Sequence, residues 1–417
     1  MTKPSHPQNV KPGYKQTEVG VIPDDWEIRP CSDVCDRIMV GVVIRPTQYY
    51  EKNGVTALRS ANIRENGITN SDLVYISEKS NALLAKSQTE SGDVLTVRTG
   101  YPGTSAVVPP SLAGCNCIDI LITRPSEKLS SEYLAVWINS SFGKEQVLRN
   151  QGGLAQKHFN VGDMRNLVVA LPRLPEQRAI AGALSDVDAL LGGLDQLIAK
   201  KRDLKQAAMQ QLLTGQTRLP GFHGEWDVKK LGELARIQRG ASPRPIDSPI
   251  WFDENSSIGW VRISDVTRSG MFLRETTQQL SPLGVQHSRP VGKGSLIMSI
   301  CATVGRPIIT EIDVCIHDGF VVFDNLQANK LFIYYVLKWI EPGWSMHGQT
   351  GSQMNLNTGL INGTKISLPK SGEQTAIAEM LTDMDAELAA LEQRRAKTRA
   401  LKQGMMQELL TGRTRLV

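Results

Sequence analysis

Side chains that can hydrogen-bond to the edges of nucleic-acid bases gather in the loops of two stretches of this chain. Arginine and lysine reach guanine, and asparagine and glutamine reach adenine, through paired hydrogen bonds in the major groove. Any one of these residues is explained as well by a solvated loop, but several occupy corresponding places in both stretches. The candidates are Arg59, Asn62, Arg64, Arg98, Tyr101, Gln156, Lys157 and His158 in the first stretch, and Arg262, Arg268, Arg306, His347, Gln349, Gln353 and Asn355 in the second.

Motifs that would indicate catalysis are missing from the sequence. It has no G-x4-G-K-[ST] phosphate-binding loop, no G-x-S-x-G nucleophile elbow and no H-E-x-x-H zinc helix. The Asn-Pro-Pro-aromatic loop of amino-methyltransferases is missing too, since Pro109-Pro110 lacks both flanks. The pair His317-Asp318 could act as acid and base, but a structural or surface role explains it as well. We therefore expect no catalytic residue, no metal site and no cofactor on this chain.

Length and composition favour a globular protein of several domains. A chain of 417 residues suggests two to four domains, and its net charge of +5 is compatible with a nucleic-acid partner. No run of 18 apolar residues is present, and the first residues lack the apolar core of a signal peptide, so neither a membrane span nor export is expected. The six cysteines show no zinc-site spacing, which predicts reduced thiols in a cytoplasmic protein.

One segment of the chain occurs twice. Residues 171–219 recur at 368–416 with a constant offset, and about 29 of the 49 aligned positions are identical. A duplicated segment implies a duplicated role. The repeats predict four parts: a first variable domain at 1–170, a first repeated helix at 171–219, a second variable domain at 220–367 and a second repeated helix at 368–417.

The two variable stretches resemble each other more faintly. Asp25-Trp26-Glu27 parallels Glu225-Trp226-Asp227, and Gly103 parallels Gly305, with order and spacing nearly kept. Together such matches indicate two diverged copies of one α+β domain with an antiparallel or mixed sheet. Short apolar runs predict strands at 94–97, 118–123, 296–300 and 320–323, and the helical pattern covers 131–148 and 327–340.

Each repeated segment carries an apolar stripe whose steps alternate between four and three residues. This spacing is typical of the seam of a coiled coil. An acidic residue in the first turn, Glu176 or Glu373, suits the positive end of each helix dipole. About 37 residues would make a rod of roughly 55 Å. The seam positions are Ile180, Leu184, Val187, Leu191, Leu194 and Ile198 in the first helix, and Ile377, Leu381, Met384, Leu388 and Leu391 in the second.

Basic residues cluster farther along each repeated helix. They can be phosphate contacts, a solvated helix face or a surface for a partner protein, and the sequence leaves these three alternatives open. The clusters are Lys200, Lys201, Arg202 and Lys205, and Arg394, Arg395, Lys397, Arg399 and Lys402.

Two variable domains that alternate with two near-identical helices resemble the specificity subunit of type I restriction–modification systems. Each of the two helices of this chain opens with Leu-Pro-x3-Glu-Gln-x2-Ile and closes with Leu-Leu-Thr-Gly. The resemblance covers essentially the whole chain. It implies two α/β target recognition domains separated by two long antiparallel helices that form a coiled coil, in a pseudo-twofold and nearly circular arrangement. Each recognition domain would read one half of a bipartite double-stranded DNA sequence.

The resemblance also implies partners. The paired helices would set the spacer between the half-sites and dock two methylation subunits, which bind S-adenosylmethionine and methylate adenine. Motor-nuclease subunits, which use ATP and Mg, would join them to cleave unmodified DNA. The specificity subunit itself performs no catalysis in this family, in agreement with the missing motifs.

Two other interpretations remain open from the residues. A coiled-coil interaction scaffold with two protein-binding domains would show no salt-dependent DNA affinity. An endonuclease with an unfamiliar site would cleave DNA alone with a metal, and would need a carboxylate cluster that the sequence does not reveal.

Overall fold

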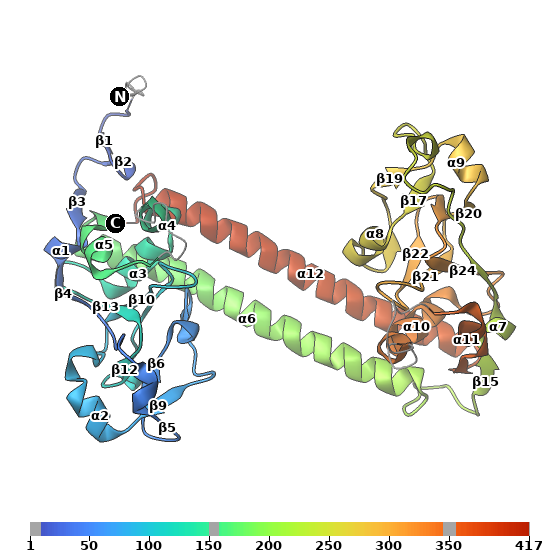
Figure 1. Cartoon of the computed structure of the whole chain (residues 1–417), viewed down its shortest axis with the longest axis horizontal. Coiled ribbons are helices and arrows are strands. Elements are labelled where there is room, and N and C mark those ends of the chain that lie inside the picture. The colour runs from blue at the N-terminus through green and yellow to red at the C-terminus, as the bar shows by residue number, and fades with distance from the viewer. Residues whose placement is uncertain (1–9, 150–157, 345–355, 417) are drawn as a thin grey trace. The chain divides into compact units, whose positions relative to one another are not determined.

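The chain forms two compact units, which we describe separately in this computed structural model (Figure 1). Its described residues are 10–149, 158–344 and 356–416. Unit 1 comprises residues 1–195 and 393–417, and unit 2 comprises residues 196–392. The boundary between the units cuts both repeated helices, so each unit contains one variable stretch and a part of each repeated helix.

Unit 1 is built from short strands in a mixed α+β arrangement. Its main sheets have the strand orders β11-β10-β13-β4 and β12-β6-β9-β5, and β12 runs parallel to β6. The strands are β1 (Tyr14–Thr17), β2 (Gly20–Pro23), β3 (Glu27–Pro30), β4 (Cys35–Val40), β5 (Tyr50–Glu51), β6 (Val55–Leu58), β7 (Ile63–Arg64), β8 (Gly67–Ile68), β9 (Val74–Ile76), β10 (Val94–Val97), β11 (Ser105–Val107), β12 (Asn116–Cys117), β13 (Ile120–Pro125) and β14 (Val168–Leu171). The helices before the first repeat are α1 (Cys31–Val34), α2 (Glu78–Leu83), α3 (Ser131–Asn139), α4 (Ser141–Arg149) and α5 (Val161–Asn166).

The helix expected over 131–148 is broken, and that part of the prediction is wrong. Ser140 has an extended backbone between α3 and α4, and its hydroxyl accepts the N–H of Gly143 at 3.3 Å. A Cβ at Gly143 would lie 2.5 Å from the carbonyl oxygens of Trp137 and Ile138, so the chain can turn this tightly only with glycine there. The turn keeps α3 packed on β10, β11 and β13.

Unit 2 repeats this plan with a larger sheet. Its sheets have the orders β16-β24-β21-β22-β18 and β19-β17-β23-β20, and β17 runs parallel to β23. The strands are β15 (Asp227–Lys230), β16 (Arg236–Arg239), β17 (Gly259–Val261), β18 (Phe272–Leu273), β19 (Gln278–Gln279), β20 (Arg289–Val291), β21 (Leu296–Ser299), β22 (Pro307–Thr310), β23 (Val314–Ile316), β24 (Phe320–Asp324) and β25 (Lys365–Leu368). The helices are α7 (Leu231–Leu234), α8 (Ile263–Arg268), α9 (Pro282–Gln286), α10 (Lys330–Trp344) and α11 (Thr358–Gly363).

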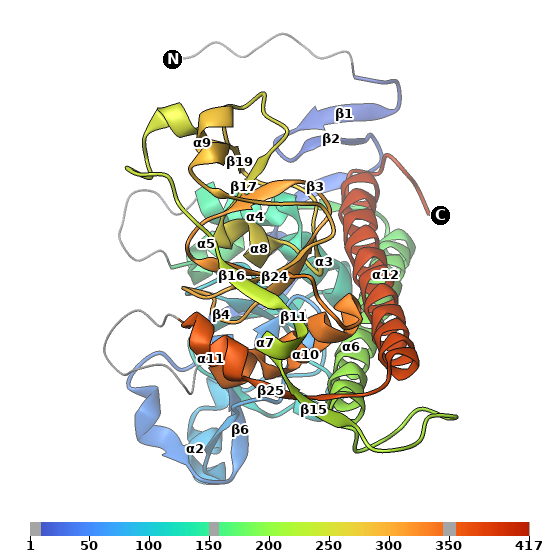
Figure 2. The same ribbon diagram turned by 90° about the vertical axis from the view of Figure 1, so that its right-hand side faces the viewer.

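The two units share their strand topology. The run β4-β13-β10-β11 of unit 1 has its counterpart in β16-β24-β21-β22, antiparallel throughout, and β3-β14 has its counterpart in β15-β25. Figure 2 shows β15 and β25 beside α7 and α11. The prediction of two related α+β domains with mixed sheets is confirmed.

The repeated segments are long helices, as predicted. The first, α6 (Leu174–Leu213), has 40 residues, and the second, α12 (Ser371–Leu409), has 39. Both helices end before a glycine with positive φ, +73° at Gly215 and +62° at Gly412. Among the described residues, no helix has the length and apolar character needed to cross a membrane.

Candidate nucleic-acid interface

The start of each repeated helix is tied to the variable domain of its own unit by the Glu-Gln pair. In unit 1 the Gln177 amide accepts the N–H of Ser130 at 2.8 Å and donates to the carbonyl of Lys128 at 3.0 Å. In unit 2 Gln374 accepts the N–H of Asn329 at 2.8 Å. Both glutamines are buried, so these bonds replace water and fix the helix against its domain.

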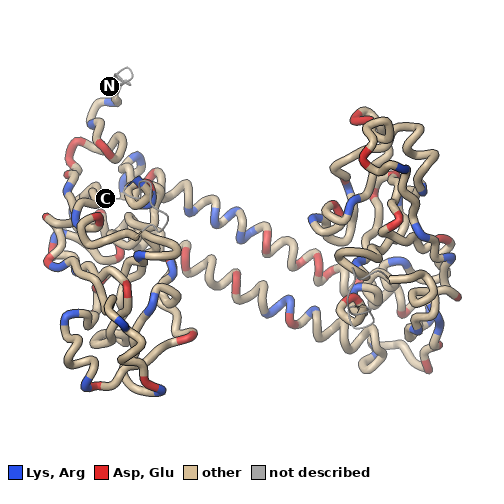
Figure 3. Tube along the Cα trace, in the orientation of Figure 1, with Lys and Arg blue, Asp and Glu red and all other residues tan. Residues whose placement is uncertain are grey.

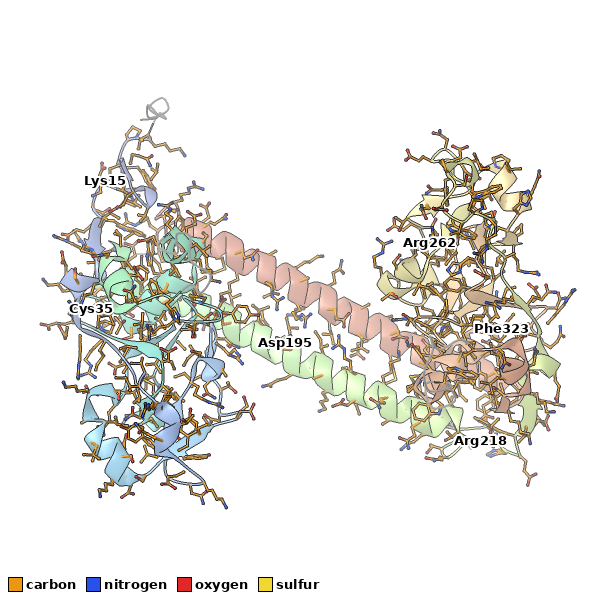
Figure 4. The ribbon with its side chains drawn as sticks, viewed as in Figure 1. Lys15, Cys35, Asp195, Arg218, Arg262 and Phe323 are labelled. Carbon is orange, nitrogen blue, oxygen red and sulfur yellow. The ribbon has the colours of Figure 1, made fainter. Side chains whose placement is uncertain are left out.

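The neighbouring glutamate binds the segment that follows Leu-Leu-Thr-Gly. In unit 2 the Arg218 guanidinium pairs with Glu373 at 2.6 Å, and the Trp226 indole N–H donates to the same carboxylate at 3.1 Å (Figure 4 labels Arg218). In unit 1 Arg415 and Trp26 make the equivalent contacts to Glu176. The sequence assigned these glutamates only to the helix dipole, but the structure shows buried anchoring carboxylates.

Basic and acidic residues are interspersed along both long helices (Figure 3). In unit 1 Asp188 pairs with Lys402 at 2.7 Å and Asp195 with Arg395 at 2.8 Å, so the helices run antiparallel there. In unit 2 Lys201 pairs with Glu387 at 2.6 Å, and Arg202 and Lys205 pair with Glu392 and Asp385. Five of the clustered basic residues thus bind the opposite helix, a use that the sequence interpretation did not include.

The predicted seam is largely buried. Ile180 and Leu184 belong to the core of unit 1 together with Leu409, the last residue of α12, and Leu410, which follows it. Ile377 and Leu381 belong to the core of unit 2 together with Leu212 of α6. Leu194, Ile198 and Leu388 are also buried, and Val187, Leu191, Met384 and Leu391 are half-buried.

The candidates of unit 1 fall into different environments. Asn62 is fully buried, and its side chain binds the backbone of Arg59 at 2.9 Å and Ser71 at 2.8 Å. Arg59 is turned onto the carbonyl of Asp72, and Arg64 is exposed beside its own strand. Asn62 therefore supports its loop in this structure, and its role as a DNA contact stays a prediction.

Arg98 and Tyr101 lie on the turn that joins β10 to β11. The Arg98 guanidinium pairs with Asp119 and donates to the carbonyl of Phe159 at 3.2 Å. The Tyr101 side chain is 85% exposed between glycines with positive φ at 100 and 103. His158 is exposed and directly precedes Phe159, the buried residue whose carbonyl accepts the hydrogen bond from Arg98. The structure thus places Arg98, Tyr101 and His158 in one region of unit 1.

Two of the three described candidates of unit 2 are held by neighbouring side chains, and the third lines a cleft. Arg262, labelled in Figure 4, donates to Gln278 at 2.8 Å, and its guanidinium carbon lies 5.8 Å from the centre of the Trp260 ring. Arg268 pairs with the buried Asp265 at 2.6 Å. Arg306 lines a cleft beside the two long helices with Tyr334 and Trp339.

The remaining six candidates lie outside the described residues, and their placement stays a prediction. They are Gln156, Lys157, His347, Gln349, Gln353 and Asn355.

Sequence reasoning missed a carboxylate that stands at the same place in both units. In unit 1 Asp119 directly precedes β13 and lies next to the loop that follows β4. In unit 2 Asp318 lies two residues before β24 and next to the loop that follows β16. In unit 2 Arg244 pairs with the Asp318 carboxylate, Arg239 binds the Asp318 backbone carbonyl, and Arg289 binds Arg239. None of the three arginines was predicted. A signal was present, since the pattern Gly-x3-Arg-Pro occurs at 41–46 and again at 240–245.

Asp318 follows His317, the histidine that the sequence considered as an acid or base. Burial lowers the pKa of His317, and the positive charges of Arg262 and Arg239 lower it further, against the opposing effect of Asp318. The His317 ring accepts the backbone N–H of Gly319 at 2.8 Å through Nδ1 and packs edge-on against Phe320. These contacts favour the structural role for this histidine.

Comparisons with known proteins agree with this architecture. The sequence pattern of the family described as type I restriction modification DNA specificity domain matches residues 23–200 and 223–399. The putative type I restriction enzyme MjaX specificity subunit of Methanocaldococcus jannaschii is 24% identical over 425 residues, which cover 97% of each chain.

Solved structures share the fold. A chain from a type I R-M system complex superposes with a TM-score of 0.60 at 21% identity, covering 94% of this chain and 99% of the other. The type I restriction-modification system S subunit from M. genitalium gives a TM-score of 0.58 at 16% identity, covering 92% and 96%. The resemblance stated from the repeats is thereby confirmed, with no support for the scaffold alternative: this chain belongs to the type I restriction–modification DNA specificity family and is a specificity subunit.

Proposed function

We propose that this subunit reads a bipartite DNA sequence, with one half-site bound by the recognition domain of each unit. The observation that carries the proposal is the repetition of one topology, anchored each time by the same Glu-Gln pair at the start of a repeated helix. Two domains of one ancestry with different loops suit two different half-sites. Half-sites about 34 Å apart, one turn of DNA, present themselves on the same face of the duplex.

The two long helices act as the ruler for the spacer, as an antiparallel coiled coil in a pseudo-twofold and nearly circular chain. The buried seam and the interhelical ion pairs within each unit support the coiled coil. The contact of Arg415 with Asp25, at 3.0 Å, supports the nearly circular arrangement, because it joins the last described residues to the first domain. A rigid helix pair holds a distance that a flexible linker would not.

The helices also dock two methylation subunits, one for each repeat. Leu204 and Leu401, which are equivalent positions of the two repeats, are 47% and 60% exposed. Apolar side chains exposed at equivalent positions suit two copies of one partner. In this assembly S-adenosylmethionine belongs to the methylation subunits, and ATP and Mg belong to motor-nuclease subunits. The chain itself is non-catalytic and acts in the cytoplasm, where its DNA lies.

Methylation mapping tests this function directly. Long-read sequencing of a cell that expresses this chain with its methylation subunit should reveal one adenine-methylated motif made of two short halves and an unspecific spacer. Exchanging residues 220–367 for those of a relative should then change one half only. A continuous motif, or a change in both halves, would contradict the proposal.

A further inference from the structure

Three arginines of unit 2 are linked to Asp318: Arg244 through the carboxylate, Arg239 through the backbone carbonyl, and Arg289 by way of Arg239. Arg244 pairs with the Asp318 carboxylate at 3.2 Å, and Arg239 donates through Nε to the Asp318 backbone carbonyl at 2.6 Å. Arg289 donates through Nε to the carbonyl of Arg239 at 2.6 Å and binds Gln238 at 2.8 Å. Three arginines from β16, β20 and the loop after β16 thus lie in one chain of contacts that includes a single carboxylate. The surface has a local excess of positive charge, which suits an anionic partner.

The loop that carries Arg244 is fixed at several points. Gly240 donates its N–H to the carbonyl of Phe320 at 2.9 Å, and a Cβ at this position would collide with the backbone of His317. The Ser242 hydroxyl donates to Asp318 at 2.7 Å. The Trp251 indole N–H donates to the carbonyl of Pro245 at 2.8 Å. Arg244 therefore projects from a backbone that is held on both sides of it.

The ion pair between Arg244 and Asp318 contributes little to folding stability. The Arg244 side chain is 70% exposed, and exposed ion pairs contribute little to folding. Only one terminal nitrogen of Arg244 has an acceptor among the described residues, so its other donors face outward. The contact with Asp318 restricts where the Arg244 guanidinium can lie, and the planar group can still offer its remaining donors as a pair to a base.

Unit 1 has the same loop, with Arg45 at the position of Arg244. Gly41 donates its N–H to the carbonyl of Ile120 at 2.8 Å, and a Cβ there would collide with Cys117, as at Gly240. The carboxylate of Asp119, however, pairs with Arg98 from the β10–β11 turn. The carboxylate position is common to both units, while the arginine that it holds comes from a different element. Such a difference suits two domains that read different sequences.

We infer that Arg244, held by Asp318, contacts a guanine of the half-site read by unit 2, and that Arg239 and Arg289 bind the phosphates beside it. Arginine pairs with guanine through O6 and N7 in the major groove, and it is the commonest side chain for this contact. Arg244 is then the specificity-determining residue, Asp318 its positioning residue, and the other two arginines contribute affinity without sequence preference. The inference rests on the proposed function, because it assigns residues to the DNA-reading surface of that function.

The first test maps the methylated motif for the full complex of this chain with its methylation subunits. Arg244→Ala should leave the half read by unit 1 and the spacer unchanged, and should make one guanine position of the other half degenerate. Arg274→Ala is the matched control, because Arg274 is 74% exposed and pairs with Glu311 at 2.8 Å in the same unit. The control should keep the wild-type motif.

The second test uses the purified complex and duplexes that carry the mapped motif. Replacing the assigned guanine by 7-deazaguanine, which lacks the N7 acceptor, should weaken wild-type binding by about 10- to 100-fold and leave Arg244→Ala unaffected. Arg244→Lys keeps the charge without the planar fork, so it should behave as Arg244→Ala does in base preference. It also replaces Arg244→Ala if that variant fails to fold. Arg239→Ala and Arg289→Ala should weaken binding to all duplexes and reduce the salt dependence.

The outcomes separate this inference from the proposed function. If the wild-type complex methylates no bipartite motif, the proposed function fails. If the wild-type complex does methylate such a motif, two results would overturn the inference alone. One is a half-site for unit 2 that contains no guanine, and the other is a half-site that stays unchanged in both Arg244 variants.

Discussion

The guanidinium of Arg415 lies against the carboxylate of Glu176, with 2.8 Å between Nη2 and Oε2, although 239 residues separate them along the chain. Only 1% of the Glu176 side chain is exposed. The same guanidinium pairs with Asp25 at 3.0 Å and lies 5.7 Å from the centre of the Trp26 ring. One side chain near the end of the chain thus binds both the start of the first domain and the start of the first repeated helix.

Removing Arg415 should destabilise unit 1. Arg415→Met removes the cation from the buried Glu176, which keeps the Trp26 N–H as its side-chain donor within the described part of the chain, and an uncompensated buried charge is costly. Because 35% of the Arg415 side chain is exposed, solvent screens part of the loss, and we expect a decrease of about 2 kcal/mol in the free energy of unfolding. Denaturant titration followed by the fluorescence of Trp26 measures it, with the other tryptophans as background.

The control for this change lies two residues earlier. Arg413 is 63% exposed and pairs with Glu408 at 3.5 Å, so Arg413→Met should have little effect. Adding Glu176→Gln to Arg415→Met should recover part of the lost stability, because a neutral amide is cheaper to leave without a cation. Equal stability of Arg415→Met and Arg413→Met would contradict the role given to Arg415.

The stability of unit 2 should fall as the pH is lowered through the range of histidine. Burial lowers the pKa of His317 in the folded state below its ordinary value of 6.5. As the pH falls, the unfolded chain therefore takes up the proton before the folded chain does. The free energy of unfolding keeps its full value above about pH 6.5 and decreases below it, by at most about 1.4 kcal/mol per pH unit.

Thermal melting between pH 7.5 and 5.5 measures this dependence. His317→Gln keeps an acceptor for the Gly319 N–H and cannot titrate, so its melting temperature should depend less on pH in this range. The exposed His287 provides the comparison, and His287→Gln should retain the wild-type slope. A wild-type slope in His317→Gln would exclude His317 as the source.

The repeats made the helices and the relation of the two domains predictable from sequence. Identity along 171–219 and 368–416 marks a duplicated element, and alternating apolar steps specify a buried stripe. The strands of the sheets were predictable from local composition, because runs such as Val94–Val97 are buried on both faces and consist mostly of β-branched residues. Periodicity reports which face is covered, and this information is local.

The anchoring and reading residues were not predictable in this way. Glu176 and Glu373 look like ordinary first-turn acids, and only the return of Arg415 and Arg218 shows what they bind. Asp318 and Arg244 are 74 residues apart, and no spacing rule joins them. Asn62 shows a related difficulty, because a residue type suited to adenine also hydrogen-bonds to the backbone of its own loop here.

Charges introduced at the two exposed leucines of the repeats should impair binding of the methylation subunits. Leu204→Glu and Leu401→Glu place a carboxylate where the proposed partner surface is apolar, and we expect at least about tenfold weaker binding at the affected repeat. Each single variant should still bind one partner, and the double variant neither. Mass photometry of the assembled complexes counts the bound subunits.

The folding of these variants should be unaffected, because both leucines are exposed. Gln210→Glu and Gln407→Glu are matched controls, since they are exposed and equivalent in the two repeats and lie on another face of each helix. Full assembly by the leucine variants would place the docking surface elsewhere.

Lengthening the helix pair should change the spacer and nothing else. Four residues inserted after Leu191 add about 6 Å of helix, which corresponds to about one or two base pairs of DNA. The insertion falls between Asp188 and Asp195, whose partners Lys402 and Arg395 lie on α12. A compensating insertion after Thr398 keeps both ion pairs in register, so the paired variant should fold better than either insertion alone. Methylation mapping should show both half-sequences unchanged around a longer spacer, whereas a changed half-site with the original spacer would reject the helices as the ruler.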